Sequence, residues 1–115
     1  MQYMALIYDT EHNRSSMSPD DHKRLLADYS AFTTAVKDAG VFIAGDALNP
    51  VDTATTIRIR DGKTLMTDGP FAETKEQLGG YYLLECKDLD EALEWAAQIP
   101  TAKHGSIEVR PLMVW

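Results

Sequence analysis

The sequence predicts an α+β fold in which an antiparallel sheet carries two helices on one face. Its elements follow one another as strand, helix, two or more strands, helix and strand. Each predicted helix has a single apolar stripe, as expected for a helix that packs on one side of a sheet. This order is that of the ferredoxin-like βαββαβ arrangement, and residues 1–115 are expected to form one domain.

The first strand is expected at Tyr3–Tyr8, which is apolar at both parities and therefore suits burial on both faces. Asp9–Ser16 is polar and without a period, which favours a loop. A helix begins after Ser18, which can cap it, with Pro19 in the first turn and two aspartates at the positive end of the helix dipole. Apolar residues recur in this helix at helical spacing and form one stripe, and Gly40 ends the helix. The residues of this stripe are Leu25, Tyr29, Phe32 and Val36.

Sequence patterns in the middle of the chain predict three more strands. Val41–Ala44 forms the first, and Gly45-Asp46 ends or bends it. Thr55–Arg60 alternates between an apolar and a basic side. Asp61-Gly62 is a favoured two-residue hairpin turn, so Lys63–Thr67 should fold back beside it.

The last part of the chain predicts a strand, a helix and an edge strand. Gly79-Gly80 precedes the strand Tyr81–Cys86, and Asp88–Glu91 has the spacing of a capping box. The buried stripe of the helix is expected to consist of Leu89, Ala92, Leu93 and Ala96. The final strand is expected at Ser106–Val109. Pro111, which follows it, has no backbone NH to donate, so this end of the strand should lie at an edge of the sheet.

Composition limits the classes of partner. With 18 acidic and 11 basic residues the formal charge is −7, which disfavours nucleic acid and anionic membrane surfaces. The single Cys86 cannot form an internal disulfide and is expected to be buried, which fits a reducing cytoplasm. The apolar N-terminal run is short and lacks a preceding basic segment, so we interpret it as a strand rather than a signal peptide.

We expect a homodimer, because the sheet face without helices carries apolar residues that need a partner. The simplest partner is a second copy, with the two sheets facing each other. The C-terminal residues Leu112–Trp115 are likewise too apolar for a free tail.

The motifs of the chain resemble those of the DGPF group of YCII-related proteins. The matching segments run nearly end to end: Asp68-Gly-Pro-Phe71, Ala72-Glu-Thr-Lys-Glu76, Gly79-Gly-Tyr-Tyr82, Asp90-Glu-Ala92, Glu94-Trp-Ala96, Ile99-Pro100 and Gly105-Ser-Ile-Glu-Val-Arg-Pro111. The resemblance implies a dimeric α+β barrel in a bacterial protein of a family whose members mostly have no assigned activity. Some relatives are encoded beside, or fused to, extracytoplasmic-function sigma factors, which implies a regulatory association.

Asp68 is the first candidate for a catalytic residue. A carboxylate at a rigid turn beside Phe71 can lose part of its hydration, which would raise its pKa towards that of a general base. The alternative is that Asp68 only caps the turn. The resemblance also implies a histidine and aspartate pair in a cleft, with Asp68 as the acid. His22 is the weaker candidate for the histidine, because the register favours Asp28 or Tyr29 at that position.

Basic residues on the predicted strands are candidates for binding a small carboxylate or phosphate. Arg58, Arg60 and Arg110 should project from the open sheet face together with Glu108, and arginine suits bidentate contacts. The alternative is cross-strand ion pairing with glutamates such as Glu85. Further candidates for lining the pocket are Glu73, Lys75 and Tyr81, for which a solvated surface or a core position is the alternative.

No metal or cofactor is expected. His12, His22 and His104 lack metal-ligand spacing, Gly79-Gly80 precedes a strand rather than a helix, and no nucleophile motif occurs. The sequence therefore leaves two functions open. One is a small-molecule site between subunits, used for acid/base catalysis at Asp68 or for binding an acidic metabolite. The other is a non-catalytic regulatory or interaction module.

Overall fold

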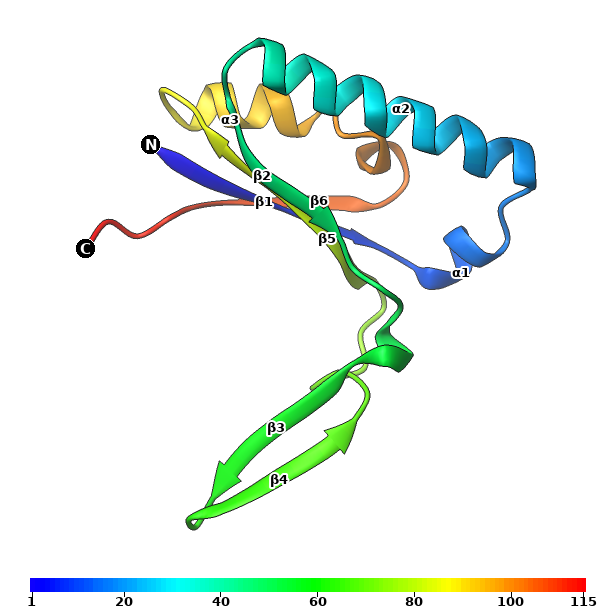
Figure 1. Cartoon of the computed structure of the whole chain (residues 1–115), viewed down its shortest axis with the longest axis vertical. Helices are drawn as coiled ribbons and strands as arrows, with labels where there is room; N and C mark the ends of the chain where they lie inside the picture. Colours follow the sequence, from blue (N-terminus) through cyan, green and yellow to red (C-terminus); the bar gives the residue numbers. More distant parts are fainter.

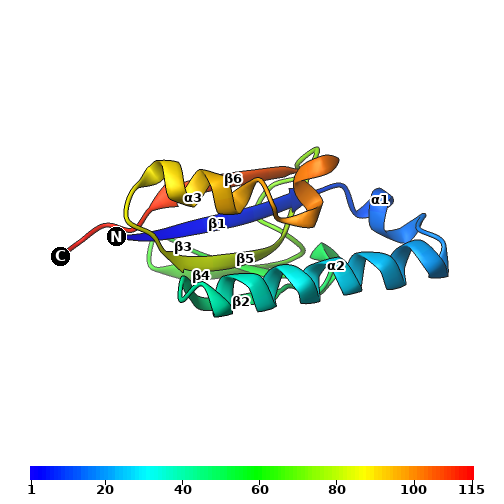
Figure 2. The same ribbon diagram turned by 90° about the horizontal axis from the view of Figure 1, so that it is seen from above.

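The computed structural model describes all 115 residues and contains a four-stranded antiparallel sheet with its long helices on one face (Figures 1 and 2). The strand order is β2-β5-β1-β6. The four strands are β1 (Gln2–Asp9), β2 (Phe42–Ala47), β5 (Gln77–Glu85) and β6 (Ser106–Pro111). This confirms the predicted ferredoxin-like βαββαβ fold, and β6 with Pro111 lies at an edge as expected.

The long helix α2 (Pro19–Asp38) begins as predicted, since the Ser18 hydroxyl accepts a hydrogen bond from the Asp21 backbone NH at 3.1 Å. The predicted loop at Asp9–Ser16 is wrong, because this stretch contains the short helix α1 (Glu11–Ser15). The hydroxyl of the preceding threonine caps α1, and one turn of helix is too short to show an apolar period. No helix is long and apolar enough to cross a membrane.

Helix α3 (Leu89–Ala96) begins at the predicted capping box, where the Asp88 carboxylate accepts a hydrogen bond from the Glu91 backbone NH at 2.9 Å. Its buried face is narrower than predicted. Ala92 and Ala96 are buried, whereas Leu89 and Leu93 are each 46% exposed. The two alanines bring the helix close to the sheet, so the leucines lie at the edge of the contact between helix and sheet and stay partly exposed.

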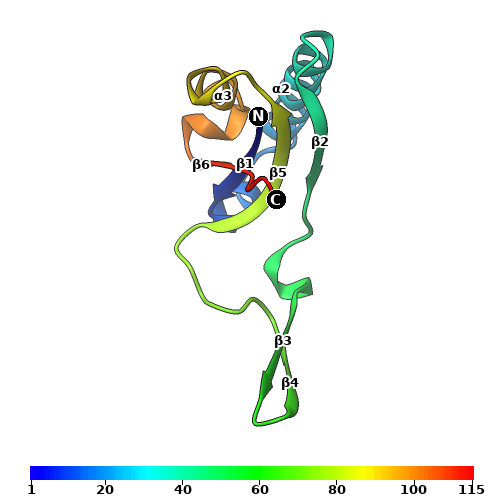
Figure 3. The same cartoon turned by 90° about the vertical axis from the view of Figure 1, so that its left-hand side faces the viewer.

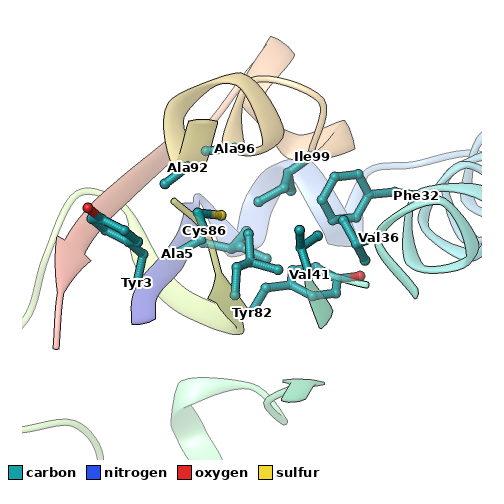
Figure 4. Close-up of a cluster of buried hydrophobic side chains, with 12 residues drawn as sticks. Tyr3, Ala5, Phe32, Val36, Val41, Tyr82, Cys86, Ala92, Ala96 and Ile99 are labelled. Carbon is teal, nitrogen blue, oxygen red and sulfur yellow. The ribbon is translucent and has the colours of Figure 1, made fainter. Parts of the chain in front are cut away.

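The core lies between the helices and one face of the sheet (Figure 4). Phe32 of α2 meets Tyr82 of β5 edge to face, with ring centroids 5.0 Å apart. Cys86 is buried as predicted, and burial, together with nearby Glu91, raises the pKa of its thiol to about 11. Only 15 of the 115 residues are buried, so this core is one layer deep and leaves the opposite sheet face without cover.

Strands β3 (Thr55–Arg60) and β4 (Lys63–Asp68) form a separate two-stranded hairpin, here called the arm. Its turn is the predicted one, with Asp61 at φ 50° and Gly62 at φ 73°. The arm projects from the body on the side away from the helices (Figures 1 and 3). The expectation that the basic side of β3 belongs to the open sheet face is therefore wrong.

Gly45-Asp46 and Gly79-Gly80 lie inside strands rather than at their ends. Strand β2 continues through Gly45-Asp46 to Ala47, and β5 begins before Gly79-Gly80. A Cβ at Gly80 would stand 2.9 Å from the Asp46 carbonyl oxygen, so glycine lets the two strands approach. The register of β1 with β5 shifts beside this pair, between Ile7 and Tyr8.

Candidate functional site

A cavity of about 440 Å³ lies between α2 and the sheet, near the end of the sheet from which the arm departs. Most of its walls are apolar, with Leu25 and Leu26 of α2 facing Phe42, Leu48 and Leu78 of the sheet side. This volume is within the usual range for sites that enclose a small organic molecule. Helix α2 and the helix-covered face of the sheet, with Ile7 and Tyr82, form its main walls.

Asp9 at the end of β1 lines this cavity and is only 8% exposed. Its Oδ1 accepts hydrogen bonds from the Thr10 backbone NH and from Asn13 Nδ2, both at 2.8 Å. Its Oδ2 lies 3.2 Å from His104 Nε2. Partners on both oxygens hold this buried carboxylate in one orientation.

Gly105 allows His104 to reach Asp9. A Cβ at Gly105 would collide with the Tyr8 carbonyl oxygen and would come within 2.8 Å of the Thr101 side chain. The turn after η2 (Pro100–Lys103) therefore runs directly against β1. Only a residue without a side chain permits this approach.

Two pairs of hydroxyl groups also line the cavity. The Tyr29 hydroxyl lies 2.5 Å from Thr101 Oγ1, and the Tyr82 hydroxyl lies 2.8 Å from Thr33 Oγ1. Burial raises the pKa of Tyr29 above its ordinary value. A phenol is protonated at neutral pH and can donate a hydrogen bond, and the raised pKa extends this state further into alkaline solution.

Arg14 supplies a positive charge beside the cavity. It forms none of the three ion pairs of the chain. Its guanidinium lies beside β5, since a Cβ built on Gly79 would be 3.5 Å from Arg14 Nη1. The other cation of the lining, Lys37, lies 5.0 Å above the ring of Phe42. Arg14 is thus the cation best placed to meet an anionic group in the cavity.

Two of the predicted site residues line this cavity. His22 does so from the first turns of α2, where it is exposed to solvent. Tyr81 contributes from β5, and its hydroxyl donates a hydrogen bond to Asp46 at 3.3 Å. No three His, Cys, Asp or Glu side chains are grouped as a metal site would require.

The other predicted residues lie elsewhere in the chain. Asp68 is exposed at the end of β4, outside the cavity, beside Gly69 with φ 99°. Glu73 and Lys75 are exposed in the segment between β4 and β5. A catalytic role for Asp68 stays a prediction, and it would require groups supplied from outside this chain.

The arginines predicted to form one cluster are not brought together. Arg58 donates to the Phe71 carbonyl oxygen at 3.2 Å and Arg60 to that of Ile59 at 2.9 Å, both within the arm and its adjoining loop. Arg110 is exposed on β6. None of the three forms the predicted ion pairs with Glu85 or Glu108, and Glu85 instead pairs with the N-terminal amine at 2.7 Å.

Local sequence patterns do not reveal Asp9, Arg14 and His104 as site residues. A signal for Asp9 and His104 exists in the topology, because β1 and β6 are antiparallel neighbours. The end of β1 must then lie beside the residues that precede β6. No comparable signal marks Arg14, which belongs to the short helix that the sequence did not reveal.

Comparison with known proteins adds a family and a fold. The family model of the YCII-related domain matches residues 1–115. The uncharacterized protein R00369 of Rhizobium meliloti (strain 1021) is 42% identical over 117 residues, covering 100% of this chain and 94% of that protein. The solved structure of 5-chloro-2-hydroxyhydroquinone dehydrochlorinase from Burkholderia phenoliruptrix AC1100, in complex with 2,5-dihydroxybenzoquinone, is 14% identical with a TM-score of 0.54. The similarity covers 98% of this chain and 94% of the dehydrochlorinase chain, and at this identity it shows the fold alone.

Proposed function

This chain belongs to the YCII-related domain family, as its motifs predicted, and we propose that its cavity binds a small, mostly apolar molecule bearing an acidic oxygen. We further propose that Asp9 moves a proton on this molecule without a cofactor. The observation that carries the proposal is the buried Asp9 carboxylate, held by partners on both oxygens in the wall of a cavity of about 440 Å³.

The preference for an acidic oxygen rests on the donors of the cavity. Arg14 has no carboxylate partner and presents a planar guanidinium that suits a carboxylate or phenolate. Tyr29 and Tyr82 add hydroxyl groups among the apolar walls. A small acidic metabolite, the ligand class expected from the sequence, therefore fits the cavity rather than the surroundings of Asp68.

The preference for proton transfer rests on Asp9 and His104. An ionised carboxylate is an acceptor, and a fixed acceptor beside a bound molecule can act as a general base worth about 10²–10⁴-fold in rate. His104 on Oδ2 has a side chain 37% exposed, so it connects the buried carboxylate with solvent. A proton taken from the ligand side can then exchange with water on the other side.

The choice of compounds for a first test follows from the structural neighbour. That dehydrochlorinase was solved with 2,5-dihydroxybenzoquinone, a small ring with acidic hydroxyls. Apolar walls, phenolic donors and an arginine would suit such a ring in this chain. Hydroxylated quinones, phenols and benzoates are therefore the compounds to try first.

The binding test is titration calorimetry with these compounds on the wild type and two cavity variants. Arg14→Met should weaken binding of an anionic ring by about tenfold or more, since a charge-assisted contact is worth roughly 1.5–3 kcal/mol. The matched control is Arg24→Met, whose arginine is exposed and pairs with Asp21 at 3.8 Å. Equal loss in both variants would contradict a site at Arg14.

The catalytic test is exchange of carbon-bound protons of the ligand with deuterated water, followed by NMR. The wild type should accelerate exchange, and Asp9→Asn should abolish the acceleration while still binding the compound. If the wild type binds a compound but never accelerates exchange or conversion, the protein is a binder and the proton-transfer step is wrong. If no compound of these classes binds, the ligand proposal fails, and the sequence-based alternative of a sigma-factor-associated regulatory module becomes the better hypothesis.

A further inference from the structure

The cavity is a long groove rather than a round pocket. On α2 its lining runs from His22 to Lys37, a length of about 22 Å at a rise of 1.5 Å per residue. On β2 it includes both ends of the strand, Phe42 and Ala47, which are about 17 Å apart at 3.3 Å per residue. A round cavity of about 440 Å³ would be much shorter than either length. Because α2 extends along the sheet (Figures 1 and 2), a ligand that fills the groove must be elongated.

A cation lies at each end of this groove. Arg14 lies beside Gly79, and Lys37 lies 5.0 Å above the ring of Phe42. Since Phe42 pairs with Leu84, these two places are separated along β5 by about 17 Å. Neither cation forms an ion pair within the chain. Both charges therefore lack a carboxylate partner from the protein.

The carboxylates that line the groove have other partners. Asp9 is held on both of its oxygens. Glu11 accepts a hydrogen bond from the Val51 backbone NH at 3.1 Å, and Asp46 accepts one from the Tyr81 hydroxyl at 3.3 Å. None of them neutralises the cation at either end.

Between its two ends the groove needs no charged group from a ligand. The hydroxyl of Tyr29 is paired with that of Thr101 at 2.5 Å, and the hydroxyl of Tyr82 with that of Thr33 at 2.8 Å. The apolar side chains of the lining include Ile7, Leu25, Leu26, Leu48 and Leu78. An apolar chain or ring can lie here without leaving a buried polar group of the protein unpaired.

We propose that the molecule bound in this cavity is elongated and carries a second acidic group, which Lys37 binds at the end of the groove opposite Arg14. This second contact presupposes the proposed function, in which Arg14 binds the first acidic group. Lys37 then selects ligands by their length and by the number of their charges. A single ring fills only the Arg14 end, whereas a diacid of suitable length spans both ends.

Linear dicarboxylates are suitable probes because their length follows from their bonds. With C–C bonds of about 1.5 Å, the carboxyl carbons of extended decanedioate are roughly 11 Å apart. A contact of about 3 Å at each end gives a reach of about 17 Å, the separation of the two cations along β5. Hexanedioate is too short by roughly 5 Å. The monomethyl ester of decanedioate keeps the length and has a single charge.

Titration calorimetry with these probes tests the proposal. The wild type should bind decanedioate more tightly than its monomethyl ester. Lys37→Met should lower this ratio of affinities by about fivefold, the upper end for an exposed ion pair, and Lys37→Arg should retain it. Affinity for the ester and for hexanedioate should not change, since neither brings a charge to Lys37, and this also shows that the variant is folded. Lys23→Met is the matched control, because Lys23 is exposed on the same helix outside the cavity and should leave the ratio unchanged.

Three results would overturn the contact at Lys37. They are decanedioate that binds no more tightly than its ester, a ratio that Lys37→Met leaves unchanged, and a ratio that Lys23→Met lowers equally. The proposed function survives each of these results if benzoates or phenols bind at Arg14. Failure of every acidic probe to bind, rings included, overturns both proposals.

Discussion

Gly105 is the residue on which the contact between Asp9 and His104 depends. Gly105→Ala would drive a Cβ into the Tyr8 carbonyl oxygen, so the turn must move away from β1. We expect a loss of about 1–3 kcal/mol in the free energy of unfolding, measured by urea denaturation, as for other overpacked sites. Gly79→Ala is the control, because its Cβ would find no atom closer than 3.5 Å. Equal stability of the two variants would contradict this reading of the turn.

The half-buried Tyr29 predicts how the free energy of unfolding changes in alkaline solution. Burial raises the pKa of Tyr29 in the folded state above the ordinary tyrosine value of 10.0. The unfolded chain therefore loses this proton first, and the free energy of unfolding falls as pH rises through the unfolded pKa towards the folded one. We expect the wild type to lose stability more steeply above pH 10 than Tyr29→Phe, measured by urea denaturation at each pH. Parallel pH profiles of the two proteins would contradict a buried, protonated phenol.

Helix α3 shows how much one cap matters to a short element. It has only eight residues, and two of its leucines are half exposed, so packing holds it weakly. Asp88→Ala removes the acceptor for the Glu91 backbone NH and should cost about 1 kcal/mol in the free energy of unfolding. Asp90→Ala, in the first turn of the same helix, should cost only a few tenths of a kcal/mol, the size of a dipole effect. Urea midpoints of the two variants test the difference, and a reversed order would contradict it.

Elements with local signals were predictable from the sequence, and the candidate site was not. The Ser18 cap, the Asp88 cap and the Asp61-Gly62 turn each satisfy their own backbone groups, so neighbouring residues reveal them. The cavity arises where α2 crosses the sheet, and its dyad joins Asp9 to His104 from opposite ends of the chain. This contact depends on the order of the strands in the sheet, which local periodicity does not predict.

The arm was predicted as a hairpin but not as a separate element for a similar reason. Alternation in β3 shows that one face is apolar, yet it does not say which surface covers that face. Ile57 and Ile59 alternate as residues of a half-buried strand do, yet no part of the chain covers them, and they are 62% and 65% exposed.

At the scale of the whole molecule, the segment that leads into the arm also lines the cavity. Leu48 and Asn49 line the cavity and lead into the short helix η1 (Val51–Thr53) at the root of the arm. The Val51 backbone NH donates to the Glu11 carboxylate at 3.1 Å, and Glu11 also lines the cavity. If the arm docks on a second copy, docking fixes this root and with it one side of the cavity.

Dimerisation and ligand binding should therefore be coupled, and coupling between sites is reciprocal. If the exposed Ile57 and Ile59 contact the second copy of the predicted homodimer, the variant Ile57→Glu with Ile59→Glu should be monomeric. It should then bind an anionic ring at least about fivefold more weakly than the wild-type dimer, the lower end of usual coupling energies. At saturation the compound should tighten the wild-type dimer by the square of that factor, about 25-fold, because each dimer has two cavities; sedimentation equilibrium with and without the compound measures this. Leu93→Glu should behave as wild type in both measurements. Equal affinity of monomer and dimer would show that the root of the arm is rigid without its partner, and that the cavity is complete in a single chain.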